Sequence, residues 1–154
     1  MRNKDYFREF SILVEKYPIE IFTFEILIAI ILNPSFRMTA LLFMGVAVTA
    51  VFSEGLKLFF KEKRPEEALK RNFYKRTFRI NRRSFPSSHS AIAAFFPTLF
   101  FSSILFIPFL IFGIVVMYSR IYIKSHYLRD IIAGALIGVV IGIVFIWLNA
   151  NLRI

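Results

Sequence analysis

Two apolar runs without any charged residue constrain the fold of this chain most. One extends from Ser90 to Tyr118, and the other covers residues 131–149. A helix that crosses the hydrocarbon core of a bilayer needs about 20 apolar residues. With 57% hydrophobic and 18% aromatic residues, the chain is also more apolar than a soluble domain of 154 residues usually is. The sequence therefore predicts an integral membrane protein.

Further helices are predicted on the N-terminal side of these runs. Residues 18–33 form a short apolar segment that contains Glu20 and Glu25, so they make a marginal span. A longer segment covers residues 36–60. The first seventeen residues have the pattern of an amphipathic helix on the membrane surface. The predicted fold class is all-α, a polytopic membrane helix bundle of five to six transmembrane helices with an N-terminal amphipathic helix.

The two apolar runs differ in how clearly they define helices. The run from Ser90 to Tyr118 could be one long helix or a helical hairpin, since its periodicity does not decide between the two. Residues 127–149 form the clearest span, and their glycines recur every fourth residue, which predicts close helix packing in lipid. These glycines are Gly134, Gly138 and Gly142. Without an internal repeat or a low-complexity linker, residues 1–154 are predicted to form a single domain.

Charged and polar residues cluster at three junctions beside the apolar segments. The junctions are "KLFFKEKRP" (57–65), "FPSSHS" (85–90) and "SRIYIKSHYLRD" (119–130). Taken singly, each base has an ordinary role, because lysine and arginine at helix ends commonly anchor the helix at the level of the lipid head groups. A lone histidine can likewise cap a helix or lie at the interface.

Taken together, the junctions predict a binding site for phosphate. His126 and Asp130 are four residues apart, so on one face of a helix start the carboxylate can accept the imidazole N–H and fix its tautomer. The other ring nitrogen is then left as a nucleophile. His89 follows a predicted helix start, where first-turn amides and the helix dipole favour an anion. Fixed positive charge would come from Lys57, Arg64 and Arg120.

The three junctions together resemble the signature of the type 2 phosphatidic acid phosphatase superfamily, in order and in internal spacing. The matching residues are Lys57, Arg64 and Pro65, then Pro86, Ser87, Ser88 and His89, then Ser119, Arg120, His126 and Asp130. The family usually has glycine where Ser88 stands. Since serine is small and compatible with a helix start, we expect activity to survive this departure.

The resemblance implies a role for each matching residue. His126 would attack phosphorus to form a phosphohistidine, with Asp130 orienting its ring, and His89 would act as acid and then as base. The non-bridging oxygens would be held by Lys57, Arg64, Ser87, the Ser88 amide and Arg120. No metal or other cofactor is expected, because the sequence lacks a cluster of carboxylates or histidines with metal-ligand spacing.

A shared pocket also decides between one helix and a hairpin. In a single helix, His89 and Arg120 would lie roughly 46 Å apart, on opposite sides of the membrane. The run must therefore reverse near residues 102–108, which gives five spans where the family usually has six. Two rival classes are less compatible with the sequence: the soluble vanadate-dependent haloperoxidases that share the signature, and a non-enzymatic phospholipid carrier with a basic pocket.

The basic segment at residues 70–83 bears on the substrate. It holds seven bases and no acid, interleaved with aromatic residues. A solvated loop or an anchor on an anionic bilayer is one interpretation. The other is head-group binding by Arg76, Arg79, Arg82 and Arg83 to a polyanionic, phosphorylated membrane lipid. On that reading lipid A 1-phosphate fits best, followed by undecaprenyl pyrophosphate and then phosphatidylglycerol phosphate. Nucleic acid is not an expected partner, since the bases border membrane spans.

Two arguments about membrane sidedness conflict. Only Arg37 and Arg153 lie opposite the pocket in this topology, so the positive-inside rule places the pocket in the cytoplasm. Resemblance to envelope lipid phosphatases instead favours the bacterial inner membrane with the active site facing the periplasm. Because many of these bases belong to the pocket or its approach loop, we favour the periplasmic face.

Overall fold

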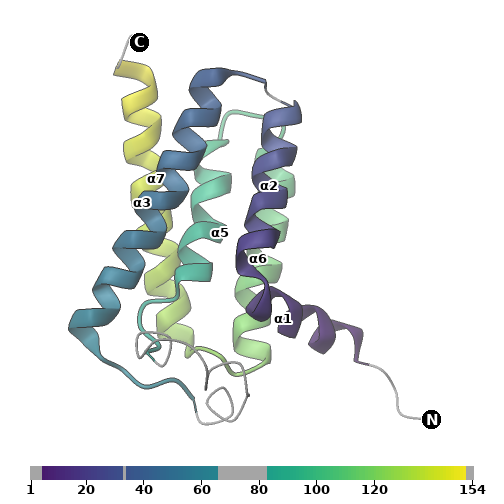
Figure 1. Ribbon diagram of the computed structural model, residues 1–154, viewed down its shortest axis with the longest axis vertical. Helices are drawn as coiled ribbons and strands as arrows, with labels where there is room; N and C mark the ends of the chain where they lie inside the picture. The colour runs from purple at the N-terminus through teal and green to yellow at the C-terminus, as the bar shows by residue number, and fades with distance from the viewer. Residues whose placement is uncertain (1–4, 33, 66–82, 152–154) are drawn as a thin grey trace.

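The computed structural model describes residues 5–32, 34–65 and 83–151, and these residues are organised as helices. The six helices are α1 (Tyr6–Lys16), α2 (Pro18–Leu32), α3 (Phe36–Phe60), α5 (Ser88–Leu99), α6 (Phe106–Tyr122) and α7 (Leu128–Asn151). Five of them run along the long axis of the bundle, whereas α1 projects sideways at one end (Figure 1). The predicted all-α fold class is confirmed.

Helix α5 is the centre of the bundle and packs against α3, α6 and α7. Its residues from Ser90 to Pro97 are all buried, which suits a segment of small and aromatic side chains without charge. Phe95 and Phe96 are completely buried, and the Phe95 ring makes an edge contact with Phe145 at 5.9 Å between centroids. A central helix buried on all sides explains why its apolar residues show no helical periodicity.

The glycine stripe of α7 packs directly on α5. A Cβ atom at Gly134 would lie 2.3 Å from the Ser87 carbonyl oxygen, and one at Gly138 would lie 2.0 Å from the Ala91 carbonyl oxygen. Any side chain at these positions would therefore push the two helices apart. The prediction that these glycines permit close helix packing is confirmed. Gly134 also lets the backbone of Ser87 lie directly against α7.

The chain reverses between α5 and α6, as the shared pocket predicted. Helix α5 ends at Leu99, residues 100–105 form turns, and α6 begins at Phe106. Figure 1 shows the reversal at the end of the bundle opposite α1. As a result, the first turn of α5 and the last turn of α6 lie at the same end, although Arg120 follows His89 by 31 positions in the sequence.

Two of the helices in the described ranges are long and apolar enough to cross a membrane, α3 and α7. Helix α6 is apolar but shorter. The 15 residues of α2 extend for about 22 Å, less than the ~30 Å of a hydrocarbon core. On α7, large apolar side chains such as Leu136 and Val140 are about 60% exposed, which suits a surface in contact with lipid.

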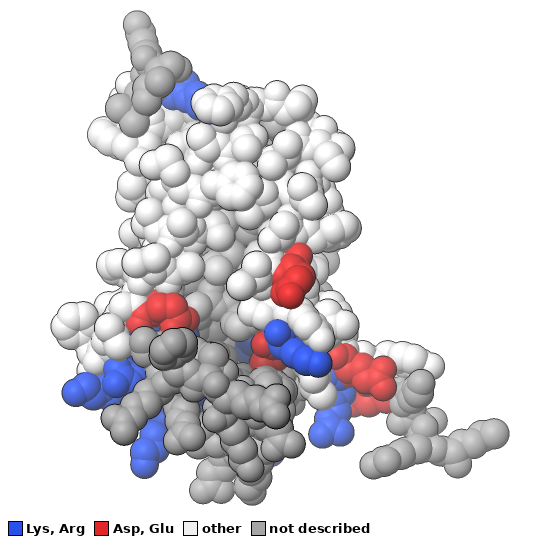
Figure 2. Space-filling view, viewed as in Figure 1, with Lys and Arg blue, Asp and Glu red and all other residues white. Residues whose placement is uncertain are grey.

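Helix α1 packs against α6. Ser11, Val14 and Glu15 are buried, and the Phe7 ring lies 5.0 Å from that of Tyr122. Leu13, by contrast, is half exposed. Figure 2 shows that acidic and basic side chains gather at the end of the bundle where α1 lies, while most of the remaining face is uncharged.

Candidate active site

The three junctions meet at the charged end of the bundle. The last turn of α3, the first turn of α5 and the link between α6 and α7 contribute to this end. Hydrogen bonds tie the junctions together: the Ser87 amide donates to the Asp130 carbonyl oxygen at 3.0 Å, and Arg64 donates to the Ser125 carbonyl oxygen at 3.3 Å. The residues predicted from three separate motifs therefore belong to one cluster.

His126 and Asp130 form the pair that their spacing predicted, with one difference in local structure. Nδ1 of His126 lies 3.5 Å from Oδ2 of Asp130, and both side chains are buried. Asp130 is in the first turn of α7, but His126 precedes the helix, which begins at Leu128. Asp130 Oδ2 also accepts a hydrogen bond from the Tyr127 amide at 3.0 Å. The carboxylate therefore also stabilises the backbone of the segment between α6 and α7 that contains His126.

Arg64 defines the tautomer of His126. Its Nη1 lies 3.0 Å from Nε2 of His126. Because a guanidinium can only donate hydrogen bonds, Nε2 must carry the lone pair and Nδ1 the hydrogen. Burial, reinforced by the positive charge of Arg64, lowers the pKa of His126 to about 3. The imidazole is therefore neutral near pH 7, with its lone pair on the nitrogen that faces the arginine.

Ser84 is a member of this cluster that the sequence analysis missed. Its hydroxyl donates to Oδ2 of Asp130 and lies 3.4 Å from Nδ1 of His126. The side chain is fully buried. A serine outside the three motifs carries no signal in the sequence, since only the fold brings residue 84 against residue 130.

The N-terminus of α5 has the geometry expected of an anion site. Ser87 is the N-cap, and its hydroxyl oxygen accepts hydrogen bonds from the amide and the hydroxyl of Ser90, at 3.4 and 2.9 Å. Ser88 and His89 follow in the first turn, where the amides point out of the helix. As the first two amides of the helix, those of Ser88 and His89 have no acceptor within it.

Lys57 is held by Glu54, which lies one turn earlier on α3 and belongs to none of the three junctions. Nζ of Lys57 donates to Oε1 of Glu54 at 2.6 Å, and Oγ of Ser88 donates to the same oxygen at 2.7 Å. Lys57 is 3% exposed. A signal for Glu54 was present, because a charged residue one turn before Lys57 is unusual in an apolar helix.

A cavity of about 490 Å³ joins this cluster to an apolar region. Its polar end is lined by Glu15, Glu54, Lys57, Arg64, Ser88 and His89. Its apolar part lies between α2, α3 and α5 and includes Phe22, Val46 and Ile92. Nε2 of His89 is buried and has no hydrogen-bond partner among the described residues, which leaves it available to a molecule in the cavity.

Arg120 lies in the last turn of α6 and is completely buried. Its guanidinium donates to the Ser119 hydroxyl at 3.0 and 2.8 Å and to the Ser11 carbonyl oxygen at 2.6 Å. It does not line the cavity. These contacts attach α1 to the candidate active site, so Arg120 has a structural role in addition to any contact with phosphate.

Comparison with known proteins agrees with this geometry. The family model of the PAP2 superfamily matches residues 38–154, which include all three junctions. The chain belongs to the PAP2 superfamily. Members of the superfamily are phosphatases, so the chain is assigned in general terms to the enzymes that hydrolyse phosphate esters. No curated protein and no solved structure matches the chain significantly.

The basic segment of this PAP2-superfamily protein can be located only at its end. Nη1 of Arg83 donates to the Lys57 carbonyl oxygen at 2.8 Å, and a β-bridge pairs Arg83 with Lys63. Arg83 therefore fixes the end of α3 near the cavity. The other three predicted head-group residues, Arg76, Arg79 and Arg82, lie outside the described residues.

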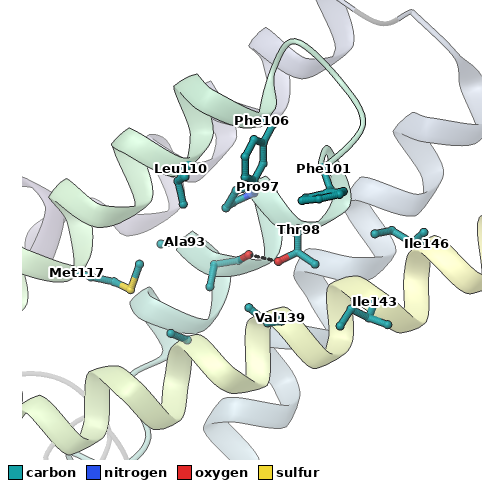
Figure 3. A pocket seen from close by; sticks show the side chains of 12 residues that line it. Ala93, Pro97, Thr98, Phe101, Phe106, Leu110, Met117, Val139, Ile143 and Ile146 are labelled. Carbon is teal, nitrogen blue, oxygen red and sulfur yellow. Dashed lines mark hydrogen bonds between the residues drawn. The ribbon is translucent and has the colours of Figure 1, made fainter.

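A second cavity has none of the chemistry of the first. It has a volume of about 500 Å³ and lies over α5 between α6 and α7. Its lining is almost wholly apolar, including Met117, Phe106 and Val139, and the one hydroxyl shown, that of Thr98, is bonded to the Ala94 carbonyl oxygen (Figure 3). Within the described ranges, no group of three or more potential metal ligands occurs in either place.

Proposed function

We propose that this protein is a metal-independent lipid phosphate phosphatase that acts through a phosphohistidine on His126. The observation that carries the proposal is the arrangement of Arg64, His126 and Asp130, with the lone pair on Nε2 and the N–H directed at a buried carboxylate. A neutral imidazole with a fixed tautomer is the form that can act as a nucleophile.

In the first step, the Nε2 lone pair of His126 forms a bond to phosphorus while the bond from phosphorus to the ester oxygen breaks. His89 donates a proton to the departing oxygen, so the lipid alcohol leaves neutral. The Nδ1–H of His126 remains directed at Asp130, whose negative charge stabilises the positive charge that develops on the ring.

In the second step, water attacks phosphorus and the P–N bond breaks, which returns the electron pair to Nε2. His89 accepts a proton from the attacking water and regains the form in which it began. Lys57, Arg64, Ser87, the Ser88 amide and Arg120 would hold the non-bridging oxygens in both steps. For Arg64 this means exchanging its bond to His126 for one to phosphate, which releases the nucleophile when substrate is present.

We further propose that α2, α3, α5, α6 and α7 cross the membrane, with α1 on its surface. The charged end of the bundle would then lie at the head-group level and the exposed apolar side chains in the hydrocarbon core. The cavity supports a lipid substrate, because its polar end would receive the phosphate and its apolar part an acyl chain. The partners are thus a phosphorylated membrane lipid and an anionic bilayer.

The substrate that we propose is lipid A 1-phosphate, with undecaprenyl pyrophosphate and phosphatidylglycerol phosphate as alternatives. The support is the excess of bases beside the phosphate pocket, of which Arg83 lies next to Lys57. We place the protein in the bacterial inner membrane with its active site towards the periplasm. Cysteines substituted for Phe73 and Asn151 and probed with an impermeant thiol reagent in intact cells test this, and labelling at position 73 alone is expected.

Phosphate release from purified protein in detergent tests the proposed function. Lipid A, undecaprenyl pyrophosphate, phosphatidylglycerol phosphate and phosphatidic acid are supplied in turn, with chelator present. We expect phosphate release from at least one lipid and an acid-labile, alkali-stable phosphoenzyme after rapid quenching. A protein that releases no phosphate from any of them, or a His126→Ala variant that retains the phosphoenzyme, would contradict the mechanism.

A further inference from the structure

Glu54 places a carboxylate inside a site built for an anion. Its Oε1 accepts hydrogen bonds from Lys57 and from Ser88, at 2.6 and 2.7 Å. Its Oε2 makes no hydrogen bond to any residue in the described ranges, and the side chain is 41% exposed. The carboxylate is thus held firmly through one oxygen while the other is available to a molecule in the cavity.

Helix α3 orders the groups along the cavity. Val46, Ala50, Glu54 and Lys57 all line it, and their spacing places them on one face of the helix. At 1.5 Å per residue, Glu54 lies about 4.5 Å along the axis from Lys57 and about 6 Å from Ala50. A lipid with its phosphate at Lys57 and its chain along Ala50 must therefore present to Glu54 the atoms beside the scissile phosphate.

The Glu54 carboxylate has two consequences for a substrate. It repels a second anionic group next to the scissile phosphate, and it accepts a hydrogen bond from a hydroxyl or an amide N–H in that position. Its negative charge also offsets the positive charge of Lys57, which lowers the net positive charge that the site offers to a polyanion. Ser88 strengthens this arrangement, because the glycine usual at its position in the family would have no hydroxyl to fix the carboxylate.

We propose that Glu54 is a specificity-determining residue that selects phosphate monoesters with a hydrogen-bond donor beside the phosphate and discriminates against diphosphates. This inference rests on the proposed phosphatase function and deepens it. It favours a sugar 1-phosphate with a neighbouring amide over a pyrophosphate. It assigns the discrimination to one side chain that no motif contains.

Two substrate pairs with known chemistry test the proposal in detergent. The first pair is farnesyl phosphate and farnesyl diphosphate, which share one chain. The second is ceramide 1-phosphate, which has an amide N–H and a hydroxyl near the phosphate, and phosphatidic acid, which has neither. We expect the wild type to prefer the first member of each pair in kcat/KM. Glu54→Gln should reduce both preferences about tenfold. In the first pair the change should be a lower KM for the diphosphate, and in the second a higher KM for ceramide 1-phosphate.

The control is Glu20→Gln, which removes the same charge from an exposed position on α2 outside the cavity and should leave both preferences unchanged. Ser88→Gly should shift both preferences in the same direction as Glu54→Gln, and it carries the test if Glu54→Gln does not fold. Preferences within twofold of wild type in the folded variants, or a wild type that prefers the diphosphate, would overturn the role of Glu54 alone. A wild type inactive on these four lipids and also on lipid A, undecaprenyl pyrophosphate and phosphatidylglycerol phosphate would overturn the proposed function as well.

Discussion

Nη1 of Arg64 lies 3.0 Å from Nε2 of His126, although the two residues come from different junctions of the chain. The contact joins a group that binds anions to the atom that would attack phosphorus. It keeps the lone pair on Nε2 while the site is without substrate, since the arginine can only donate. Phosphate would compete for the same guanidinium, so in the proposed mechanism substrate binding would release the nucleophile.

The first prediction concerns the nucleophile and the absence of a metal requirement. Activity should be unchanged in chelator and inhibited by vanadate, which adopts the five-coordinate geometry of the transition state. His126→Ala, His89→Ala and Arg120→Ala should each lose about 10²–10⁴-fold or more in kcat. Phosphate release measured on the purified variants checks this, and loss of turnover in chelator alone would exclude the mechanism.

The second prediction concerns pH. Because burial lowers the pKa of His126 to about 3, the folded protein resists a protonation that the unfolded chain undergoes near pH 6.5. The contribution to stability is therefore complete above pH 6.5 and is lost as the pH falls from 6.5 towards 3. Thermal unfolding between pH 7 and 4 should show this loss, and His126→Gln should show a smaller one.

The protonation state of the His126 ring can also be observed directly. In ¹⁵N-histidine NMR of the protein in micelles, His126 should remain a neutral Nδ1–H tautomer at pH 5. Arg64→Gln removes the neighbouring positive charge and should raise the pKa of His126 towards its usual value. An imidazolium signal for His126 in the wild type at pH 5 would be incompatible with the assignment.

The third prediction concerns Ser84, whose hydroxyl donates a hydrogen bond to Asp130. Ser84→Ala leaves the buried carboxylate with one hydrogen bond fewer, which costs about 1–3 kcal/mol where the group cannot be solvated. If the lost hydrogen bond stabilises the transition state more than the bound substrate, kcat should fall about tenfold or more with little change in KM. Ser102→Ala, in the exposed turn at the opposite end, is the matched control and should have wild-type kinetics.

The fourth prediction concerns the packing of α7 on α5. Gly138→Ala places a methyl group against the Ala91 carbonyl, so the helices must separate, at a cost of roughly 1–3 kcal/mol. Gly55→Ala is the control, because nothing lies within 4 Å of the added methyl group. It should be neutral or slightly stabilising, since alanine is the better helix former. Thermal unfolding in detergent compares the two variants, and equal melting temperatures would count against the packing argument.

The fifth prediction concerns the basic segment. Replacing Arg76, Arg79 and Arg82 with glutamine should raise KM for lipid A much more than KM for phosphatidic acid, if these bases bind a polyanionic head group. Arg83→Gln is tested separately, because Arg83 also holds the end of α3 through the Lys57 carbonyl. Equal changes in KM for both lipids would remove the basis for assigning lipid A as the substrate.

The sequence by itself determined the helical fold class, the reversal between α5 and α6, and the list of motif residues. Each of these follows from local or one-dimensional properties: uncharged runs of fixed length, glycines at one spacing, and three junctions in a particular order. The boundaries of α3 agree with the predicted segment at residues 36–60 because polar residues mark both ends. The reversal was predicted from a pocket shared by His89 and Arg120; the structure places both at the same end of the bundle, although Arg120 does not line the cavity.

Only the tertiary structure decided how these residues meet. It placed Arg64 against Nε2 of His126, Ser84 against Asp130, and Glu54 between Lys57 and Ser88. Apart from the bond between Glu54 and Lys57 within α3, these contacts join separate segments of the chain. The approach of α7 to α5 depends in turn on the glycines of α7. Sequence spacing describes neighbours along one helix, whereas side chains from separate helices become neighbours only when the bundle packs.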